Sequence, residues 1–435
     1  MSYRNRELAS LVVVGLMTGF GFASVYIARQ DVVSASSLSY GIFFLCLYLA
    51  AHAVTRLTVP NADPYILPLG GLLTAIGVTE IYRINPQDAL HQTIWIVIGV
   101  VAFALTLFLF RRDYRKLESY KYLCGLGAVG LLMLPALPVI GERINGARLW
   151  IHFGGFQIQP GEFAKILLIV FLAGYLREKR EVLAQGRLKD LGPLLLIWGA
   201  AMLVLLETSD LGSALLYFGI FLAMTYVATG SKKYPIGGGV LFLLGSFAAY
   251  HLVGRVRERV TIWLHPWTNH FVYCSQTGKV NHLRQDCDSY QLVKSLYSIG
   301  NGHFGGTGFG KGTFTDTAGN PLIPYLKTDF IFSALAQELG LIGVAAFLLV
   351  YMVFALRGFR IGMIAEDGFS KLLAVGLTFG FVLQTFIIVG GVLRIIPLTG
   401  ITLPFVSYGG SSIVANFVVL AGLLLVSDRA QARNA

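Results

Sequence analysis

The chain has 435 residues, of which 55% are hydrophobic and 13% are charged, and its mean hydropathy is +0.68. Soluble domains carry about 25% charged residues, so this composition excludes an ordinary soluble protein and indicates an integral membrane protein. Basic loops facing an anionic lipid leaflet explain the formal net charge of +11, and without a zinc-ligand spacing, an RNA-binding signature or a basic tail we expect no nucleic-acid partner.

Apolar stretches long enough to cross a bilayer recur along the whole chain. A helix needs about 20 apolar residues to span the hydrocarbon core. Twelve stretches approach this length, with approximate cores at residues 8 to 28, 38 to 55, 65 to 82, 90 to 110, 122 to 140, 160 to 176, 191 to 207, 211 to 229, 235 to 253, 331 to 356, 372 to 393 and 411 to 427. The first is too long for a typical signal peptide, so we expect a retained helix. The sequence therefore predicts an all-α, polytopic membrane bundle of about twelve helices.

Lysine and arginine predict the orientation of this bundle. They gather on alternate connections, at Arg4 and Arg6, at Arg56, at Arg111, Arg112, Arg115, Lys116 and Lys121, at Arg177, Lys179, Arg180, Arg187 and Lys189, at Lys232 and Lys233, at Arg357, Arg360 and Lys371, and at Arg429 and Arg433. Cytoplasmic loops accumulate basic residues, so we expect both termini in the cytoplasm. The long polar segment from Gly254 to Asp329 is then extracytoplasmic.

Charged residues surround the start of the sixth predicted helix. Arg148 lies in the outer loop before it, and Pro160 is suited to its first turn. Glu162 and Lys165 are three residues apart, so they share one face of the helix and point into the bundle together. The pair either stabilises helix packing as a neutralised unit or belongs to a functional site.

The next outer connections carry a further acid and three arginines. Asp210 lies in a very short turn, where it either favours the N-terminus of the following helix or takes part in function. Arg255, Arg257 and Arg259 open the long outer segment. Arginine on the outer side opposes the positive-inside bias, so its clustering suggests an anionic partner such as a lipid phosphate. Solvation or contact with lipid headgroups is the alternative.

The long outer segment also contains two cysteines and a glycine-dense stretch. Cys274 and Cys287 can form a disulfide in an oxidising compartment, and two free thiols are the alternative. The stretch from Gly300 to Gly312 nearly spells a phosphate-binding loop, but it has no Ser or Thr after Lys311 and no preceding strand. We expect its backbone to approach another segment closely or its amides to meet an anion, with simple loop flexibility as the alternative.

Asp329 ends the long segment, where Thr328-Asp329-Phe330-Ile331-Phe332 runs back into the membrane. A carboxylate against hydrocarbon must be capped, paired or used, which makes Asp329 the first candidate for function. Nearer the C-terminus, the turn that contains Ser411 has small residues that allow close helix approach.

Together these segments resemble the family of shape, elongation, division and sporulation (SEDS) proteins, the peptidoglycan polymerases of the RodA, FtsW and SpoVE type. The resemblance covers nearly the whole chain after about residue 64, in Gly146 to Ile151, Gln159 to Lys165, Ser209 to Ser213, Arg259 to Thr261, His265 to Trp267, Tyr290 to Leu296, Gly300 to Gly312, Thr328 to Phe332, Glu338 to Gly340, Pro397 to Gly400 and Ser407 to Ser412. Gly161 stands where the family usually has Ser, Gln337 where it has a first Glu, and Ile388 where Asn is common.

The resemblance also suggests how the chain is divided. Family members commonly have ten spans, so residues 1–63 are expected to form two additional N-terminal helices. Residues 64–253 would form the first part of the ten-helix core, residues 254–329 the large extracytoplasmic loop, and residues 330–435 the last three core helices with a short cytoplasmic tail.

The resemblance implies that lipid II is polymerised into glycan strands at the outer face of the bacterial cytoplasmic membrane, with undecaprenyl diphosphate as leaving group. Asp329 matches the essential loop acid of the family, and we expect it to act as general base on the acceptor sugar hydroxyl, with inversion at the anomeric carbon. The candidate substrate-binding residues are Arg148, Glu162, Lys165, Asp210, Arg255, Arg257, Arg259, Lys311 and Ser411.

A class B penicillin-binding protein, which is a transpeptidase, is the partner that the resemblance implies. The sequence shows no dedicated metal cage, although a divalent cation such as Mg²⁺ or Mn²⁺ could bridge Asp329 and the diphosphate. Two other functions fit the same residues: a lipid II flippase whose charges line a translocation path, and a noncatalytic scaffold for a transpeptidase. A flippase should concentrate its polar residues near the bilayer midplane, whereas here they cluster toward the outer face.

Overall fold

The computed structural model describes residues 3–30, 35–137, 140–144, 147–153, 156–184, 192–208, 210–269, 271–274, 279–316 and 321–432. Five residues used in the sequence analysis lie outside these ranges: Gly146, Arg187, Lys189, Ser209 and Arg433.

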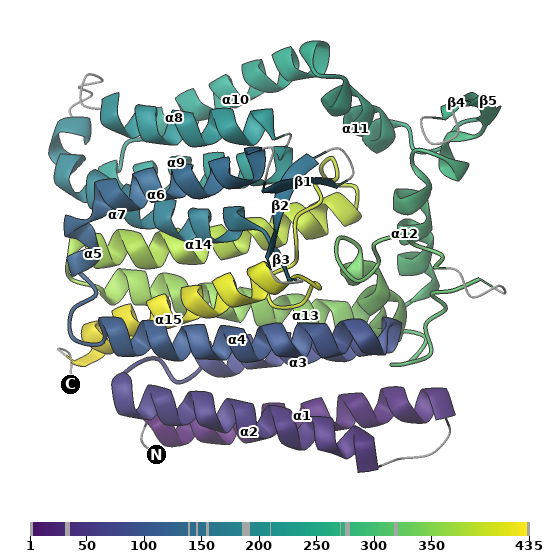
Figure 1. Ribbon diagram of the computed structural model, residues 1–435, viewed down its shortest axis with the longest axis horizontal. Helices are drawn as coiled ribbons and strands as arrows, with labels where there is room; N and C mark the ends of the chain where they lie inside the picture. Colours follow the sequence, from purple (N-terminus) through teal and green to yellow (C-terminus); the bar gives the residue numbers. More distant parts are fainter. Residues whose placement is uncertain are drawn as a thin grey trace.

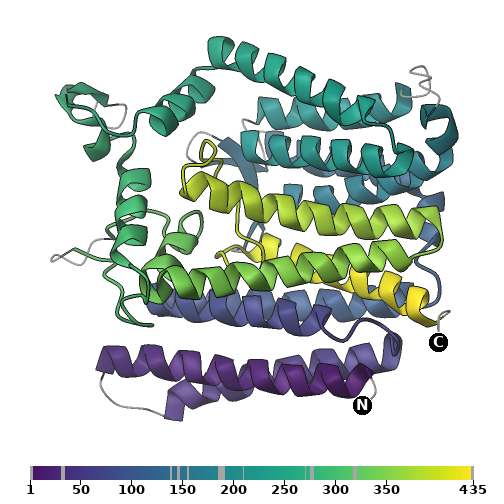
Figure 2. The same ribbon diagram turned by 180° about the vertical axis from the view of Figure 1, so that it is seen from behind.

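Helices dominate the described part of the chain (Figures 1 and 2). The α-helices are α1 (Tyr3–Gln30), α2 (Ala35–Thr58), α3 (Ile66–Ile84), α4 (Pro86–Phe110), α5 (Lys116–Ser119), α6 (Lys121–Met133), α7 (Pro160–Ala184), α8 (Gly192–Glu207), α9 (Leu211–Thr229), α10 (Lys233–Leu252), α11 (Gly254–Leu264), α12 (Tyr290–Asn301), α13 (Ile331–Ile364), α14 (Gly368–Val392) and α15 (Gly410–Ala432). Each of the twelve predicted stretches contains a helix. Within the described ranges, eight helices are long and apolar enough to cross a membrane: α1, α2, α4, α9, α10, α13, α14 and α15.

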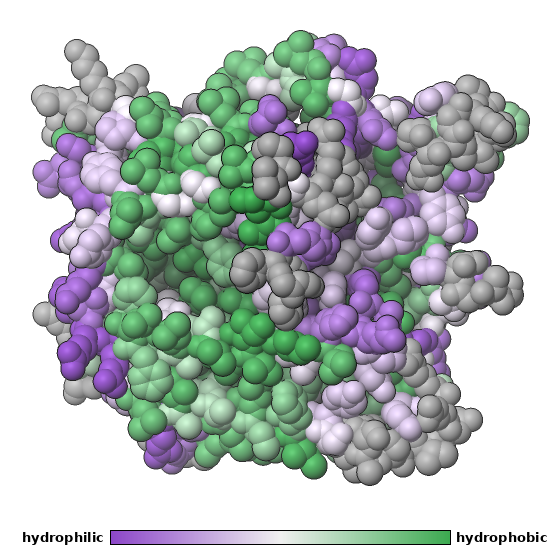
Figure 3. Space-filling model, viewed as in Figure 1, coloured by the Kyte–Doolittle hydropathy of each residue, from purple (hydrophilic) through white to green (hydrophobic). Residues whose placement is uncertain are grey.

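The long helices run side by side, and the two termini lie at one end of the bundle (Figure 1). At the opposite end lie α11, α12, β4 and β5, so the described elements between residues 254 and 301 lie away from the termini. Apolar residues cover the middle of the face seen in Figure 3, and hydrophilic residues gather towards the two ends. This distribution fits a multi-pass membrane protein with polar ends in water.

Helices α14 and α15 form the centre of the bundle, and most of their residues are buried. Helix α15 packs on α4, and α14 packs on α7, α9 and α13. Helix α10 is different, because none of its residues is buried and its main neighbours are α9 and α11. In a membrane its apolar side chains therefore face lipid.

The two N-terminal helices pack on each other, and α1 also packs on α3. The connection between α2 and α3 is bonded to the last helix: the amide of Asn61 donates to Asp428 Oδ1 at 2.7 Å, and the amide of Asp63 donates to Ser427 Oγ at 2.9 Å. Near the start of α1, the buried Glu7 accepts from Arg4 Nη1 at 2.6 Å. The first helices are thus tied to the core at the end where the termini lie.

Two small antiparallel sheets, which the sequence analysis did not predict, lie among the helices. Strands β1 (Gly141–Ile144), β2 (Ala147–Phe153) and β3 (Phe156–Ile158) pair in the order β1-β2-β3, and β4 (Val272–Cys274) pairs with β5 (Lys279–His282). The predicted span from 122 to 140 is shortened, since α6 ends before the 3-10 helix η1 (Leu134–Ala136). A second 3-10 helix, η3 (Arg284–Asp286), precedes Cys287, which forms a disulfide with Cys274.

The glycine-dense stretch packs directly on α13. The amides of Gly310 and Gly312 donate to the two carboxylate oxygens of Glu338 at 2.7 and 3.0 Å. Helix α13 is interrupted at Gly340, whose φ of 65° and ψ of −174° are accessible only to glycine. A Cβ atom at Gly340 would lie 2.2 Å from the Gly306 nitrogen. Both expectations for this stretch, close approach and amides that meet an anion, are therefore fulfilled, and the anion is a carboxylate of the chain itself.

Candidate active site

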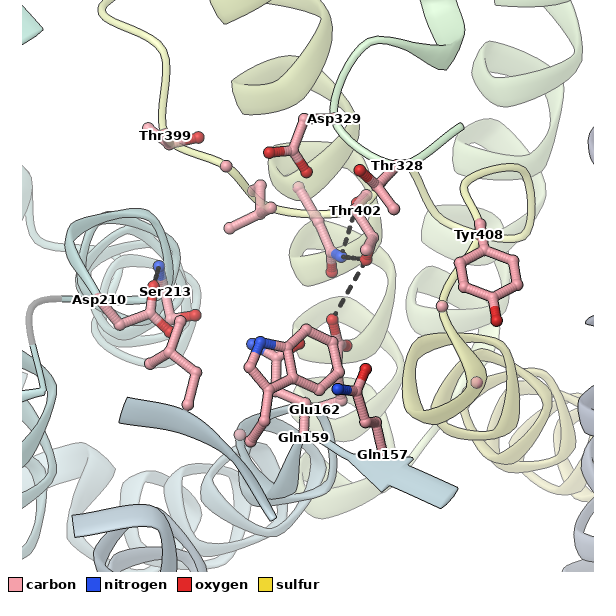
Figure 4. Close-up of a pocket in the computed structure, with 18 of the residues that line it drawn as sticks. Gln157, Gln159, Glu162, Asp210, Ser213, Thr328, Asp329, Thr399, Thr402 and Tyr408 are labelled. Carbon is pink, nitrogen blue, oxygen red and sulfur yellow. Dashed lines mark hydrogen bonds between the residues drawn. The ribbon is translucent and has the colours of Figure 1, made fainter. Parts of the chain in front are cut away.

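A cavity of about 930 Å³ lies where α4, α7, α9 and α14 meet the long polar segment that begins at α11 (Figure 4). Strands β2 and β3, α11, the turn before α13 and residues 399–402 and 408–410 complete its wall. Six of the candidate residues line it: Asp329, Glu162, Lys165, Asp210, Arg255 and Arg259. Segments from distant parts of the sequence thus converge on one volume.

Asp329 occupies the turn that leads into α13, and its amide donates to the carbonyl of Tyr325 at 3.1 Å. Figure 4 shows its side chain beside Thr328 and Thr399, at the edge of the cavity. Burial raises the pKa of Asp329 to about 6, although the positive charge of Arg259 and a hydrogen bond with Thr328 act in the opposite direction. A carboxylate with this pKa is mostly ionised at neutral pH and is more basic than an ordinary aspartate.

Arg259 is the cation that acts on this carboxylate. It lies on α11, and its Nη1 donates to the carbonyls of Thr399 at 3.1 Å and Leu398 at 3.3 Å. Burial lowers the pKa of Arg259, while the negative charges of Asp210 and Asp329 raise it. The guanidinium is therefore held in the cavity wall within electrostatic reach of both acids.

The sixth predicted helix contributes a buried polar network below the cavity. Lys165 Nζ donates to Glu162 Oε2 at 2.8 Å and to Gln384 Oε1 at 2.6 Å. Gln384 Nε2 donates in turn to the carbonyl of Thr402 at 2.9 Å. Glu162 and Lys165 are only 8% and 5% exposed, and a buried pair needs such additional partners to be tolerated. The network joins α7, α14 and the segment before α15 into a rigid floor.

Asp210 combines the two alternatives that the sequence left open. It caps α9, because its Oδ1 accepts from the amide of Ser213 at 3.0 Å, and it also lines the cavity. Burial raises the pKa of Asp210, and the Arg259 charge lowers it. The capping role fixes the carboxylate beside the cavity.

Four candidate residues do not line the cavity: Arg148, Arg257, Lys311 and Ser411. Arg257 lies between the two cavity-lining arginines of α11, so helical geometry turns it to the other side, where it is exposed and donates to the carbonyl of His251 at 2.7 Å. Ser411 lies behind the wall, where its Oγ accepts from the amide of Gln159 at 2.7 Å.

The other two belong to different surroundings. Arg148 is half-buried in β2, next to Leu149 and Trp150, which do line the cavity. Lys311 is exposed in the glycine stretch, between the two glycines that bind Glu338. Its position follows from the packing of that stretch on α13 rather than on the cavity.

Several cavity residues were not predicted. Lys327 Nζ contacts Asp88 Oδ2 at 2.5 Å and lies 4.8 Å from the centre of the Tyr408 ring. A lysine two residues before the candidate base was a usable signal, as was Gln384, a lone amide inside an apolar helix. Asp88, the partner of Lys327 outside the cavity lining, carried no such signal, because an acid in the first turn of a helix such as α4 is ordinary.

Comparisons with known proteins agree with this arrangement. Residues 66–432 match the family model for FtsW, RodA and SpoVE, described as "Cell cycle protein". The peptidoglycan glycosyltransferase RodA of Mycobacterium tuberculosis (strain ATCC 25618 / H37Rv) is 39% identical over 450 residues, which cover 98% of this chain and 91% of that protein.

Solved structures show the same fold. A chain from a study titled "Structural coordination of polymerization and crosslinking by a peptidoglycan synthase complex" is 26% identical, with a TM-score of 0.68 over 85% of this chain and 98% of that chain. The rod shape determining protein RodA of Thermus thermophilus is 25% identical, with a TM-score of 0.60 over 85% of this chain and 97% of that chain.

Proposed function

Because the chain belongs to the FtsW, RodA and SpoVE family and is a peptidoglycan glycosyltransferase, we propose that its cavity is where lipid II units are joined into glycan strands. The observation that carries this proposal is the placement of Asp329 and Arg259 in the wall of one cavity, with an acid and a fixed positive charge facing the same space. Glycosyl transfer to a sugar hydroxyl needs a base for the acceptor and a cation for the leaving group.

In the proposed reaction, Asp329 removes the proton from the acceptor hydroxyl while the hydroxyl oxygen attacks the anomeric carbon of the donor sugar. The bond from that carbon to the diphosphate breaks, and undecaprenyl diphosphate leaves with the electron pair. With a single displacement and no covalent intermediate, the configuration at the anomeric carbon inverts. A pKa of about 6 suits this role, because the carboxylate is ionised near pH 7 and still accepts a proton readily.

Arg255 and Arg259 are the basic residues of α11 that line the cavity, and we assign them to the diphosphate. Negative charge grows on the diphosphate as its bond to carbon breaks, so a fixed guanidinium stabilises the transition state more than the ground state. Lys165 is already bonded to Glu162 and Gln384, so its first role is to hold the floor of the cavity.

The residues around Asp329 fit a cation shared with substrate better than a resident one. Among the described residues, the two other candidate acids of the cavity are already engaged. Glu162 binds Lys165, and Asp210 caps α9. Mg²⁺ commonly takes one or two protein carboxylates and completes its shell with phosphate oxygens and water. We therefore propose that Mg²⁺ or Mn²⁺, where it takes part, is held by Asp329 and the diphosphate, where it would neutralise charge on the leaving group.

We also propose that the cavity end of the bundle faces the outside of the bacterial cytoplasmic membrane and that both termini are cytoplasmic. The positive-inside bias supports this orientation, as does the position of α11, which contributes to the cavity wall, at the end of the bundle opposite the termini. In this proposal residues 64–253 and 330–435 form the catalytic core, residues 254–329 its outer loop, and residues 1–63 an addition. A class B penicillin-binding protein is the proposed partner, since one similar structure belongs to a complex for polymerization and crosslinking.

The proposal is tested with Asp329→Asn in vesicles that contain labelled lipid II. Loss of the general base should slow glycan formation by about 10²–10⁴-fold while the variant remains folded and still binds lipid II. Asp286→Asn is the matched control, since Asp286 is an exposed acid of the same loop that does not line the cavity. Its rate should equal that of the unmodified chain.

Three other outcomes would count against the mechanism. Unchanged polymerisation by Asp329→Asn would remove the base. Transfer of labelled lipid II across the bilayer without glycan formation by the unmodified chain would support the flippase. Polymerisation that appears only when a transpeptidase with its own polymerase activity is added would support the scaffold.

A further inference from the structure

Helix α3 carries an acid that the cavity does not use. The side chain of Glu80 is 0% exposed, and neither of its carboxylate oxygens has a hydrogen-bond partner in the described part of the chain. Buried polar groups in native proteins are almost always hydrogen-bonded, and a buried unpaired ion is far more costly than a buried neutral group. The protonation state of Glu80 therefore needs an explanation of its own.

Glu338 on α13 is the acid that acts electrostatically on Glu80, and its own surroundings are different. It accepts hydrogen bonds from the amides of Gly310 and Gly312 at 2.7 and 3.0 Å, and Arg83 Nε lies 3.3 Å from its Oε1. Arg83 Nη2 also donates to the carbonyl of Gly312 at 2.7 Å. Two amides and a guanidinium satisfy an ionised carboxylate, so Glu338 is the charged member of this pair.

Among the residues that the structure describes, no second cation acts on Glu80. Glu338 and Arg83 are the charged groups that act on it electrostatically. Helix α1 has no charged residue between positions 8 and 28, and α15 has none between 410 and 427. Helix α4 brings Asp88, which binds Lys327, and His91, which lines the cavity, while α2 brings Tyr40, whose ring packs on Tyr82.

We propose that Glu80 is a proton-binding site, where a neutral carboxylic acid is held beside the ionised Glu338 and keeps the glycine stretch anchored to α13. One arginine cannot neutralise two buried carboxylates. Loss of the proton from Glu80 would place a second negative charge near Glu338 and would draw Arg83 away from Glu338 and Gly312. The stretch from 300 to 312 would then lose part of its attachment.

Helix α1 packs on α3 next to Glu80. Phe22 of α1 packs on Tyr82 with ring centres 5.3 Å apart. Helix α1 also passes so close to the neighbouring turn of α3 that a Cβ atom on Gly21 would lie 3.2 Å from Thr79 Cγ2. The glycine stretch touches the same helix, since a Cβ atom on Gly310 would lie 2.8 Å from Ala28 Cβ. Helix α1 therefore packs both on the turn of α3 that carries Glu80 and on the glycine stretch.

Infrared spectroscopy of the full chain in lipid nanodiscs tests the proton directly. At pH 8 the unmodified chain should show the carbonyl band of a protonated carboxylic acid, and this band should be lost in Glu80→Gln. Glu207→Gln is the matched control, because Glu207 is an exposed acid at the end of α8 and its removal should leave the band unchanged. A spectrum without a band that depends on Glu80 would overturn the proposal.

Stability against pH gives a second readout that does not depend on glycosyl transfer. The folded chain keeps a proton on Glu80 that the unfolded chain releases above about pH 4.3, so the free energy of unfolding falls as pH rises above that value. Relative to Glu80→Gln, the unfolding equilibrium constant of the unmodified chain in mixed micelles should rise about tenfold per pH unit in that range.

A second variant checks the same prediction with a side chain that has no polar amide. Glu80→Met has a similar size and no charge, and it should fold and lose the same pH dependence as Glu80→Gln. If both variants were less stable than the unmodified chain by the same factor at every pH, Glu80 would be an ionised, paired residue. The proposal would then be wrong, whatever the outcome for Asp329.

Discussion

At the scale of single residues, the site depends on the balance between burial and one cation. Burial raises the pKa of Asp329, and Arg259 opposes that rise. A carboxylate with too low a pKa accepts the proton poorly, and one with too high a pKa is already protonated at the working pH and cannot act as a base. Arg259 thus has two separable roles in the proposed reaction: it tunes the base, and it stabilises the leaving diphosphate.

These roles can be separated with Arg259→Gln. Removal of the guanidinium removes an effect that lowers the pKa of Asp329, so that pKa should rise above about 6. Because the base acts in its ionised form, activity falls as pH drops through this pKa, and the acidic midpoint of the rate profile should move to higher pH. The maximal rate should also drop by about 10²-fold, as expected when one stabilising donor is lost.

The measurement is the initial rate of glycan formation between pH 5 and pH 9. Arg257→Gln removes the same charge from the exposed side of α11 and should leave both the midpoint and the maximal rate unchanged. Equal acidic midpoints for the two variants would show that Arg259 does not act on Asp329.

Single charges in apolar surroundings were the part of the site that sequence could predict. Asp329, Glu162 and Lys165 each stand out against apolar neighbours, and the structure places all three at one cavity. The three arginines of α11 could not be told apart before α11 was known to be a helix, because only helical periodicity separates Arg257 from Arg255 and Arg259. Asp88 and Lys327 could not be paired from sequence, because their contact joins segments 239 residues apart.

At the scale of elements, hydropathy located the helices, whereas the backbone details came only from the structure. Polar ends and apolar centres are enough to find a long helix. The strands β1 to β3 are short and lie within a connection, so alternation of residue types gives little signal over so few positions. The interruption of α13 at Gly340 also left no trace in the apolar pattern, because glycine is common in membrane helices.

The interruption at Gly340 makes a prediction at this scale. Gly340→Ala should destabilise the protein by about 1–3 kcal/mol or more, because alanine is strained at this φ and its Cβ would collide with the Gly306 nitrogen. The measurement is the thermal unfolding midpoint in detergent. Gly300→Ala is the control, since Gly300 lies in α12 and a Cβ atom there would meet nothing within 4 Å. A Gly340→Ala midpoint equal to that of the control would contradict this account of the kink.

At the scale of the whole molecule, sequence predicted the class of fold and a bundle of about twelve helices, and the structure has a helix in every one of those stretches. It could not predict how the first two helices attach. Their packing on α3 depends on close contacts such as those of Gly21 and Phe22, which hydropathy does not encode. Which side chains interdigitate across two helices depends on their detailed packing in the folded protein, and a hydropathy pattern does not contain that information.

The proposed orientation can be measured in intact cells. In a chain whose free cysteines Cys46 and Cys124 are replaced by serine, Glu258→Cys should react with a membrane-impermeant maleimide, because α11 lies at the cavity end. Lys232→Cys, in the basic turn between α9 and α10, should react only after the cells are lysed. Both positions are exposed, so access to the reagent is the only difference. Reaction of Lys232→Cys in intact cells would reverse the orientation.

The bonds between the α2–α3 connection and the last helix have a mechanical consequence. Helix α15 is held at one end through Asp428, and it begins at Gly410, a residue of the cavity wall. Because most residues of α15 are buried, we expect the helix to move as one rigid element. A displacement of the connection would then be transmitted to the other end of α15, at Gly410. Lengthening or shortening that connection by one residue would therefore change the cavity wall at Gly410, which lies 18 residues before Asp428 in the same helix.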